Sequence, residues 1–162
     1  MKPVVLLACG NPSRGDDAIG PLLFERAARL CERERLAVDC LEEFQLQIEN
    51  ALDLRDRKLC LFVDASLDAT APFAFARARP SGVESPLTHA LSPSAVLAVY
   101  ERIEHAPPPP AFVLAVRGTS FELGEPLSHD ALANVEAAWG LLAALLRAPE
   151  LPRWVAEASG AA

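Results

Sequence analysis

The sequence predicts a single three-layer α/β domain, in which a mostly parallel, twisted sheet of about five strands carries helices on both faces. Short continuous apolar runs, typical of strands buried on both faces, alternate with longer segments whose apolar residues recur at helical spacing. Such alternation favours parallel strands joined by crossover helices. The 162 residues suffice for one domain with a full core. We expect this domain to span residues 1–150 and the tail, 151–162, to be loosely ordered.

Each element follows from a local pattern. Apolar runs predict three buried strands, at 4–9, 59–63 and 111–116. Alternating residues predict two further strands, at 36–41 and, at the sheet edge, 73–78. Helical spacing predicts four helices, at 21–35, 48–55, 93–104 and 130–147. Ser92, followed by a proline, and Ser128 are the expected N-caps of the last two helices.

Charge and composition exclude several classes of function. The net charge is −7, and no cluster of Lys or Arg offers a surface for nucleic acid or anionic lipid. The sequence has no apolar run of the ~20 residues that a membrane span needs, and its first residues do not resemble a signal peptide. The four cysteines are scattered, which favours structural thiols. We therefore expect a cytoplasmic protein whose partners are proteins or small molecules, with no nucleic acid and no membrane.

The segment 10–20, directly after the first predicted strand, is the most informative part of the chain. Its glycines, Gly10, Gly15 and Gly20, do not have the spacing of a dinucleotide or nucleotide-triphosphate loop. Asp16 and Asp17 add two negative charges where a phosphate would lie, so this loop favours a metal ion with oxygen ligands. The alternative is that an Asp caps the following helix, a role for which one carboxylate suffices.

Two more residues extend this candidate site. Asp64 follows the strand predicted at 59–63, and the carboxyl ends of parallel strands meet at one edge of a sheet. His89 lies in a loop that can reach the same edge. Two carboxylates and an imidazole, completed by water, suit a borderline divalent metal such as nickel or zinc. The alternative for a lone loop histidine is a surface or capping role.

Three motifs in this order resemble the [NiFe]-hydrogenase maturation endopeptidases. They are the glycine-punctuated acidic loop at 10–20, the strand end Val63-Asp64-Ala65, and Thr88-His89-Ala90-Leu91-Ser92 before a helix. The resemblance covers most of the chain. It implies that Asp17, Asp64 and His89 bind nickel carried by the substrate.

The implied reaction is one cut near the C-terminus of a hydrogenase large-subunit precursor after nickel insertion. The metal would polarise the scissile carbonyl or activate water, while Asp16 or Asp17 positions it. The sequence holds no nucleophile elbow, no H-E-x-x-H motif and no cysteine in an activating setting, which fits a metal-dependent hydrolase.

The chain departs from the family's pattern at two places. Position 17 is Asp where some members have Glu, so the metal would lie closer to the loop backbone. Residues 43–47 replace a glycine-rich stretch of many relatives, and Gln45 and Gln47 in this segment are candidate substrate-recognition residues.

Two other functions use similar residues. A receiver-like signalling domain also has an acidic pair after its first strand and an Asp after its third, with Mg²⁺. However, Asp16 and Asp17 lie several residues beyond the strand, and the last strand ends in Arg117 where such domains have Lys. The other alternative is a metal-binding adaptor without catalysis.

Overall fold

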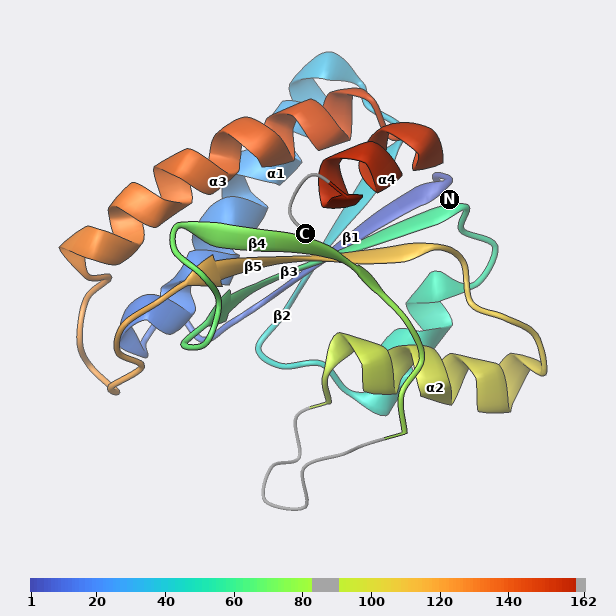
Figure 1. Cartoon of the computed structure of the whole chain (residues 1–162), viewed down its shortest axis with the longest axis horizontal. Helices are drawn as coiled ribbons and strands as arrows, with labels where there is room; N and C mark the ends of the chain where they lie inside the picture. Colours follow the sequence, from blue (N-terminus) through green and yellow to red (C-terminus); the bar gives the residue numbers. More distant parts are fainter. Residues whose placement is uncertain (83–90, 160–162) are drawn as a thin grey trace.

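The computed structural model describes residues 1–82 and 91–159 and contains a five-stranded sheet (Figure 1). The strand order is β2-β1-β3-β5-β4. Four strands are parallel, and β4, at the edge, pairs antiparallel with β5. The strands are β1 (Val4–Cys9), β2 (Val38–Glu43), β3 (Leu59–Ser66), β4 (Phe73–Ala78) and β5 (Ala111–Arg117). The predicted fold class and the edge position of β4 are confirmed.

Helices cover both faces of this sheet. One face carries α1, α3 and α4, and the other carries η2 and α2 (Figure 1). The α-helices are α1 (Ile19–Glu34), α2 (Pro93–Glu104), α3 (His129–Arg147) and α4 (Leu151–Ser159). Two 3-10 helices, η1 (Gly15–Ala18) and η2 (Ile48–Leu54), precede α1 and β3. The side chains of Ser92 and Ser128 cap α2 and α3, as predicted.

The side chains of β1 alternate between the two cores. Leu6 and Ala8 pack in the core under α1 and α3, whereas Val5, Leu7 and Cys9 pack in the core under η2 and α2. All six β1 residues are buried, which explains the continuous apolar run in the sequence. β1 and its parallel neighbour β3 are thus interior strands whose carboxyl ends lie at the same edge of the sheet.

The prediction of a loosely ordered tail is wrong as far as residue 159. Residues 151–159 form α4, which packs against β4. Trp154 is fully buried, its ring meets Phe112 edge to face at 5.6 Å, and its Nε1–H donates to the carbonyl oxygen of Leu145 at 3.1 Å. One large aromatic side chain with a satisfied polar atom therefore anchors the helix.

β1 is the strand at which the order of the sheet reverses. The connection through α1 leads to β2 on one side of β1, whereas β3 lies on its other side. Crevices form at the carboxyl ends of strands where successive connections diverge, and open α/β sheets bind ligands there. The segments after β1 and at the end of β3 meet at this switch point.

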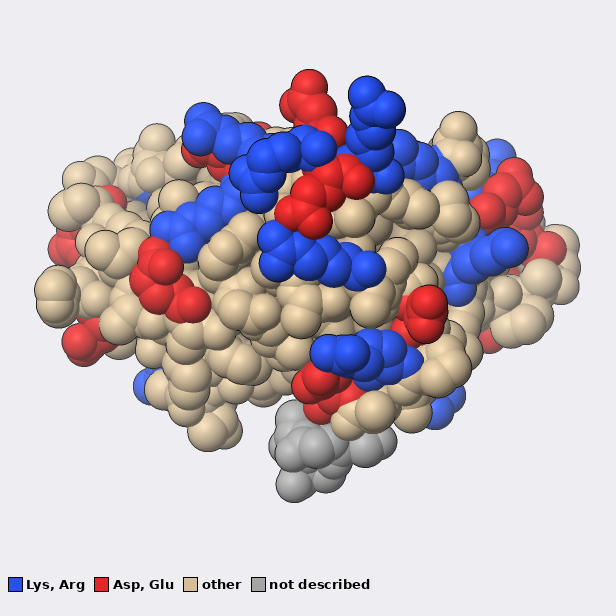
Figure 2. Space-filling model, turned by 90° about the horizontal axis from the view of Figure 1, so that it is seen from above, with Lys and Arg blue, Asp and Glu red and all other residues tan. Residues whose placement is uncertain are grey.

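Positive and negative side chains are interleaved over the helices of the α1, α3 and α4 face (Figure 2). Ion pairs there include Arg26–Glu136 and Arg29–Glu25, both at 2.5 Å, and Arg147–Glu34 at 2.8 Å. This face has no large area of one sign. Among the described helices, none is both long and apolar enough to cross a bilayer.

Candidate metal and active site at the carboxyl edge of the sheet

Two glycines allow the acidic loop to pack tightly after β1. A Cβ atom at Gly20 would lie 1.8 Å from the carbonyl oxygen of Cys9, so α1 can begin directly against the end of β1 only with glycine here. Gly15 has a φ of +54°, and a Cβ on it would lie 2.6 Å from the carbonyl oxygen of Ser120. The glycine spacing of the motif is thus explained by close backbone contacts.

Asp17 and Asp64 line the same cavity of about 180 Å³. Asp17 belongs to η1, and its Oδ2 accepts a hydrogen bond from the backbone N–H of Asn11 at 2.8 Å. Asp64 lies near the end of β3, and its Oδ1 accepts from the backbone N–H of Ala65 at 2.8 Å. Two of the predicted ligands, from segments almost fifty residues apart, therefore lie together at the switch point.

The electrostatics of this cavity suit a cation. Burial, and secondarily the negative charge of Asp17, raise the pKa of Asp64 to about 7, although the Ala65 N–H opposes the shift. A bound cation would offset both causes, because it favours the charged carboxylate. The two carboxylates thus form a donor set that fits a divalent metal ion with open coordination positions.

The third predicted ligand, His89, lies outside the described residues. Within residues 1–82 and 91–159, no group of three His, Cys, Asp or Glu side chains is arranged to hold a metal. Leu91, at the start of the segment after His89, lines the cavity with Asp17 and Asp64. Leu91, two residues after His89, therefore lies at the rim of this site, and His89 as a ligand stays a prediction.

Asp16 has a different environment from Asp17. Its side chain is 1% exposed and accepts hydrogen bonds from the backbone N–H groups of Thr119 at 2.7 Å, Ser120 at 3.3 Å and Ser128 at 2.7 Å. The hydroxyls of Thr119 and Ser128 donate to it at 2.9 and 2.8 Å. Burial alone would raise the pKa of Asp16, but these hydrogen bonds outweigh it and lower the pKa.

This arrangement gives Asp16 a positioning role. It connects the acidic loop to the segment after β5 and to the first residue before α3, and both of its oxygens are engaged. Neither η1 nor α1 has a side-chain cap, so Asp16 does not cap the helix that follows it. Of the two candidate catalytic residues, Asp16 and Asp17, we therefore keep Asp17 as the catalytic hypothesis.

Of the two predicted recognition residues, Gln45 lines the cavity and Gln47 does not. Gln47 is exposed at the start of η2, where its backbone N–H donates to Oδ1 of Asn50 at 2.8 Å. The neighbouring Phe44 also lines the cavity and is 71% exposed. Sequence reasoning included Phe44 in the segment but did not single it out, although an aromatic residue between polar ones was a signal.

Cys9 is a cavity residue that the sequence pattern placed only in the core. Burial, followed by the charges of Asp64, Glu43 and Asp17, raises the pKa of its thiol well above the ordinary value. A thiol that stays protonated is a poor nucleophile. Burial likewise raises the pKa of Cys60 to about 12. Both observations agree with the prediction that these cysteines are structural.

The fold and the site together define a class: an open α/β domain with two carboxylates at the switch point of its sheet. Comparison with solved structures narrows this class, since the chain has the fold of the [NiFe]-hydrogenase maturation proteases. The maturation protease HycI from Thermococcus kodakarensis is 23% identical, with a TM-score of 0.66 over 90% of this chain and 93% of that one.

Two further structures show the same likeness. The hydrogenase maturating endopeptidase HybD from E. coli is 22% identical, with a TM-score of 0.66 over 92% of this chain and 94% of that one. A hydrogenase 2 maturation peptidase from a Thaumarchaeota archaeon is 19% identical, with a TM-score of 0.60 over 87% and 95%. No family model and no curated protein matches the sequence.

Proposed function

We propose that this protein is a cytoplasmic endopeptidase that removes the C-terminal tail of a [NiFe]-hydrogenase large-subunit precursor after nickel insertion. One observation carries the proposal. The carboxylates of Asp17 and Asp64 share a cavity at the switch point of a sheet whose fold is that of the hydrogenase maturation proteases. The nickel arrives with the substrate and serves as the recognition element.

In this proposal the chain contributes three ligands, Asp17, Asp64 and His89. The substrate's nickel would polarise the scissile carbonyl or activate water. Asp64 must give up its proton before it binds the cation, and its pKa of about 7 makes that step easy near neutral pH. The Asn11 N–H holds Oδ2 of Asp17, which orients the carboxylate that we assign to both metal binding and catalysis. Gln45, on the wall of the cavity, is proposed to contact the substrate.

The receiver-like alternative finds no support in the topology. Receiver domains have the doubly wound strand order 2-1-3-4-5, in which chain order and sheet order run together after the third strand. Here β5 pairs with β3, and β4 is added antiparallel at the edge. An adaptor without catalysis would share the metal ligands and differs only in leaving the precursor uncut.

The test is a cleavage assay with purified protein and a large-subunit precursor prepared with and without nickel. We expect release of the C-terminal peptide, measured by mass spectrometry, only from the nickel-loaded precursor. Asp17→Asn and Asp64→Asn should each abolish release, because each removes a charged ligand from the cavity. His89→Ala tests the ligand that only the sequence predicts.

Asp68→Asn is the matched control, since Asp68 is an exposed acid four residues beyond Asp64. It should cleave as the wild type does. Circular dichroism should show that the inactive variants remain folded. Equal cleavage of the nickel-free precursor would refute nickel recognition, and binding of the loaded precursor without cleavage would favour the adaptor.

A further inference from the structure

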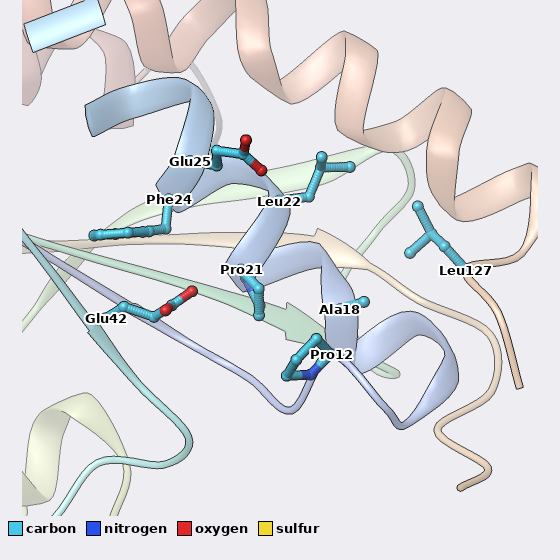
Figure 3. Close-up of a pocket in the computed structure, with 8 residues that line it drawn as sticks. All are labelled: Pro12, Ala18, Pro21, Leu22, Phe24, Glu25, Glu42 and Leu127. Atoms are coloured by element: carbon cyan, nitrogen blue, oxygen red, sulfur yellow. The ribbon is translucent and has the colours of Figure 1, made fainter. Parts of the chain in front are cut away.

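A second hollow, separate from the Asp17–Asp64 cavity, opens beside α1 (Figure 3). Its volume is about 550 Å³, within the range of ~300–1,000 Å³ typical of ligand pockets. Six of its eight lining residues are apolar and two are acidic. The lining residues are Pro12, Ala18, Pro21, Leu22, Phe24, Glu25, Glu42 and Leu127. We refer to this hollow as the α1 groove.

The apolar wall of the α1 groove follows from the helical period of α1. Ala18, Leu22 and Glu25 recur at spacings of four and three, so they form one stripe along the helix. Residues on the opposite side, such as Leu23 and Ala27, are fully buried in the core. The stripe is therefore the flank of α1 that the sheet and α3 leave partly exposed.

The α1 groove has acidic groups on one side. In Figure 3, Phe24 and Glu42 lie on the side of the hollow opposite Leu127, and Glu25 extends from the same helix as Phe24. Both acids are exposed, and Glu25 pairs with Arg29 of its own helix at 2.5 Å. Glu42 is in none of the ion pairs formed within residues 1–82 and 91–159. The groove thus offers apolar contact together with a negative charge.

Residues that are neighbours in the chain line the α1 groove and the Asp17–Asp64 cavity. Ala18, in the groove, directly follows Asp17, in the cavity. Likewise Glu42, in the groove, is two residues before Phe44, in the cavity. The acidic loop and the end of β2 therefore contribute residues to both hollows.

We propose that the α1 groove binds an extended segment of the protein substrate in which apolar side chains flank a Lys or Arg. This inference rests on the proposed function, since it assigns a second contact to the same substrate. The apolar side chains would cover Leu22, Phe24 and Leu127, and the cation would lie between the carboxylates of Glu25 and Glu42.

The first test measures binding without cleavage. Two acetylated, amidated pentapeptides, Leu-Val-Arg-Leu-Ala and the same sequence with Glu in place of Arg, are titrated into ¹⁵N-labelled protein. We expect saturable amide shifts at Ala18, Leu22 and Leu127 with the Arg peptide, and binding about fivefold weaker or worse with the Glu peptide. Raising salt from about 50 to 500 mM should reduce this difference, because the charges are near the surface.

Glu42→Lys should remove the preference for the Arg peptide. Glu32→Lys is the matched control, since Glu32 is an exposed acid two helical turns beyond Glu25 on α1 and outside the groove. It should keep the preference at wild-type strength. Absence of saturable shifts, or equal binding of both peptides, would overturn the proposal.

The second test uses the nickel-loaded precursor. At low precursor concentration, Glu25→Lys combined with Glu42→Lys should slow cleavage about five- to tenfold, and a higher precursor concentration should restore it. Unchanged cleavage at low concentration would overturn the groove proposal while the function stands. If the wild type does not cut the precursor but the groove still selects the Arg peptide, the proposed function fails and the groove proposal survives as a peptide site.

Discussion

Asp64 is a carboxyl group whose surroundings favour its neutral form. Burial and the charge of Asp17 raise its pKa to about 7, whereas in the unfolded chain the pKa has its ordinary value near 3.8. Between these values the folded state holds a proton that the unfolded state has lost. The free energy of unfolding therefore falls as the pH rises through this window.

Asp64→Asn should remove this pH dependence. At pH 8 we expect the variant to be more stable than the wild type by about 4 kcal/mol, and near pH 4 the two should be equally stable. Urea unfolding at the two pH values, without added metal, measures the difference. A variant less stable than the wild type at pH 8 would contradict this electrostatic account.

Asp16 should matter for stability more than its exposed neighbours do. Asp16→Asn replaces a carboxylate that accepts five hydrogen bonds with an amide whose NH₂ faces some of the same donors. We expect a loss of about 3 kcal/mol, which lowers Tm by roughly 6–12 °C. Thermal unfolding with Asp68→Asn as the control checks this, and a Tm within about 1 °C of the wild type would argue against the positioning role.

The adjacent acids Asp16 and Asp17 show which side-chain roles the sequence can predict and which it cannot. Asp17 and Asp64 could be paired because parallel strands bring their carboxyl ends to one edge. The partners of Asp16, Thr119 and Ser128, are more than one hundred residues away. No local pattern reports such a contact, so the separate role of Asp16 required the structure.

At the scale of elements, α4 shows the effect of one residue. Chain termini are often poorly ordered, which is why a loose tail was predicted for the segment after 150. Trp154 contacts the ring of Phe112 and the carbonyl oxygen of Leu145, which belong to β5 and α3 and are not visible in the pattern of the tail itself. Conversely, β4 was predicted at the edge because its alternation suits a strand with one exposed face, and the structure confirms it.

Trp154→Ala should destabilise the fold by about 3–5 kcal/mol, because it removes a fully buried aromatic side chain and leaves a cavity. Trp154→Phe, which loses the hydrogen bond to Leu145 but keeps most of the contact, should cost less. Urea unfolding compares both with Val155→Ala, a control at an exposed position of the same helix. If Trp154→Ala were as stable as that control, α4 would be a dispensable addition to the domain.

At the scale of the molecule, the order of the strands in the sheet brings the site residues together. β1 and β3 are neighbours, although α1, β2 and η2 separate them in the sequence, and this pairing brings Asp17 and Asp64 into one cavity. The alternation of strands and helices predicted the layers. The edge position predicted for residues 73–78 also agrees with the observed order, in which β5 lies between β3 and β4.

A cation that binds both carboxylates should therefore stabilise the whole fold, since the unfolded chain does not hold them together. The free energy gain grows with the ratio of nickel concentration to Kd, and at about ten times Kd it is roughly 1.4 kcal/mol. For a domain of this size, Tm should then rise by about 3–6 °C at pH 8. The rise should shrink below pH 7, where Asp64 retains its proton.

Thermal unfolding with and without nickel should show the shift for the wild type and Asp68→Asn, and none for Asp17→Asn. An equal shift in Asp17→Asn would place the cation elsewhere on the protein and remove the basis for the assigned site.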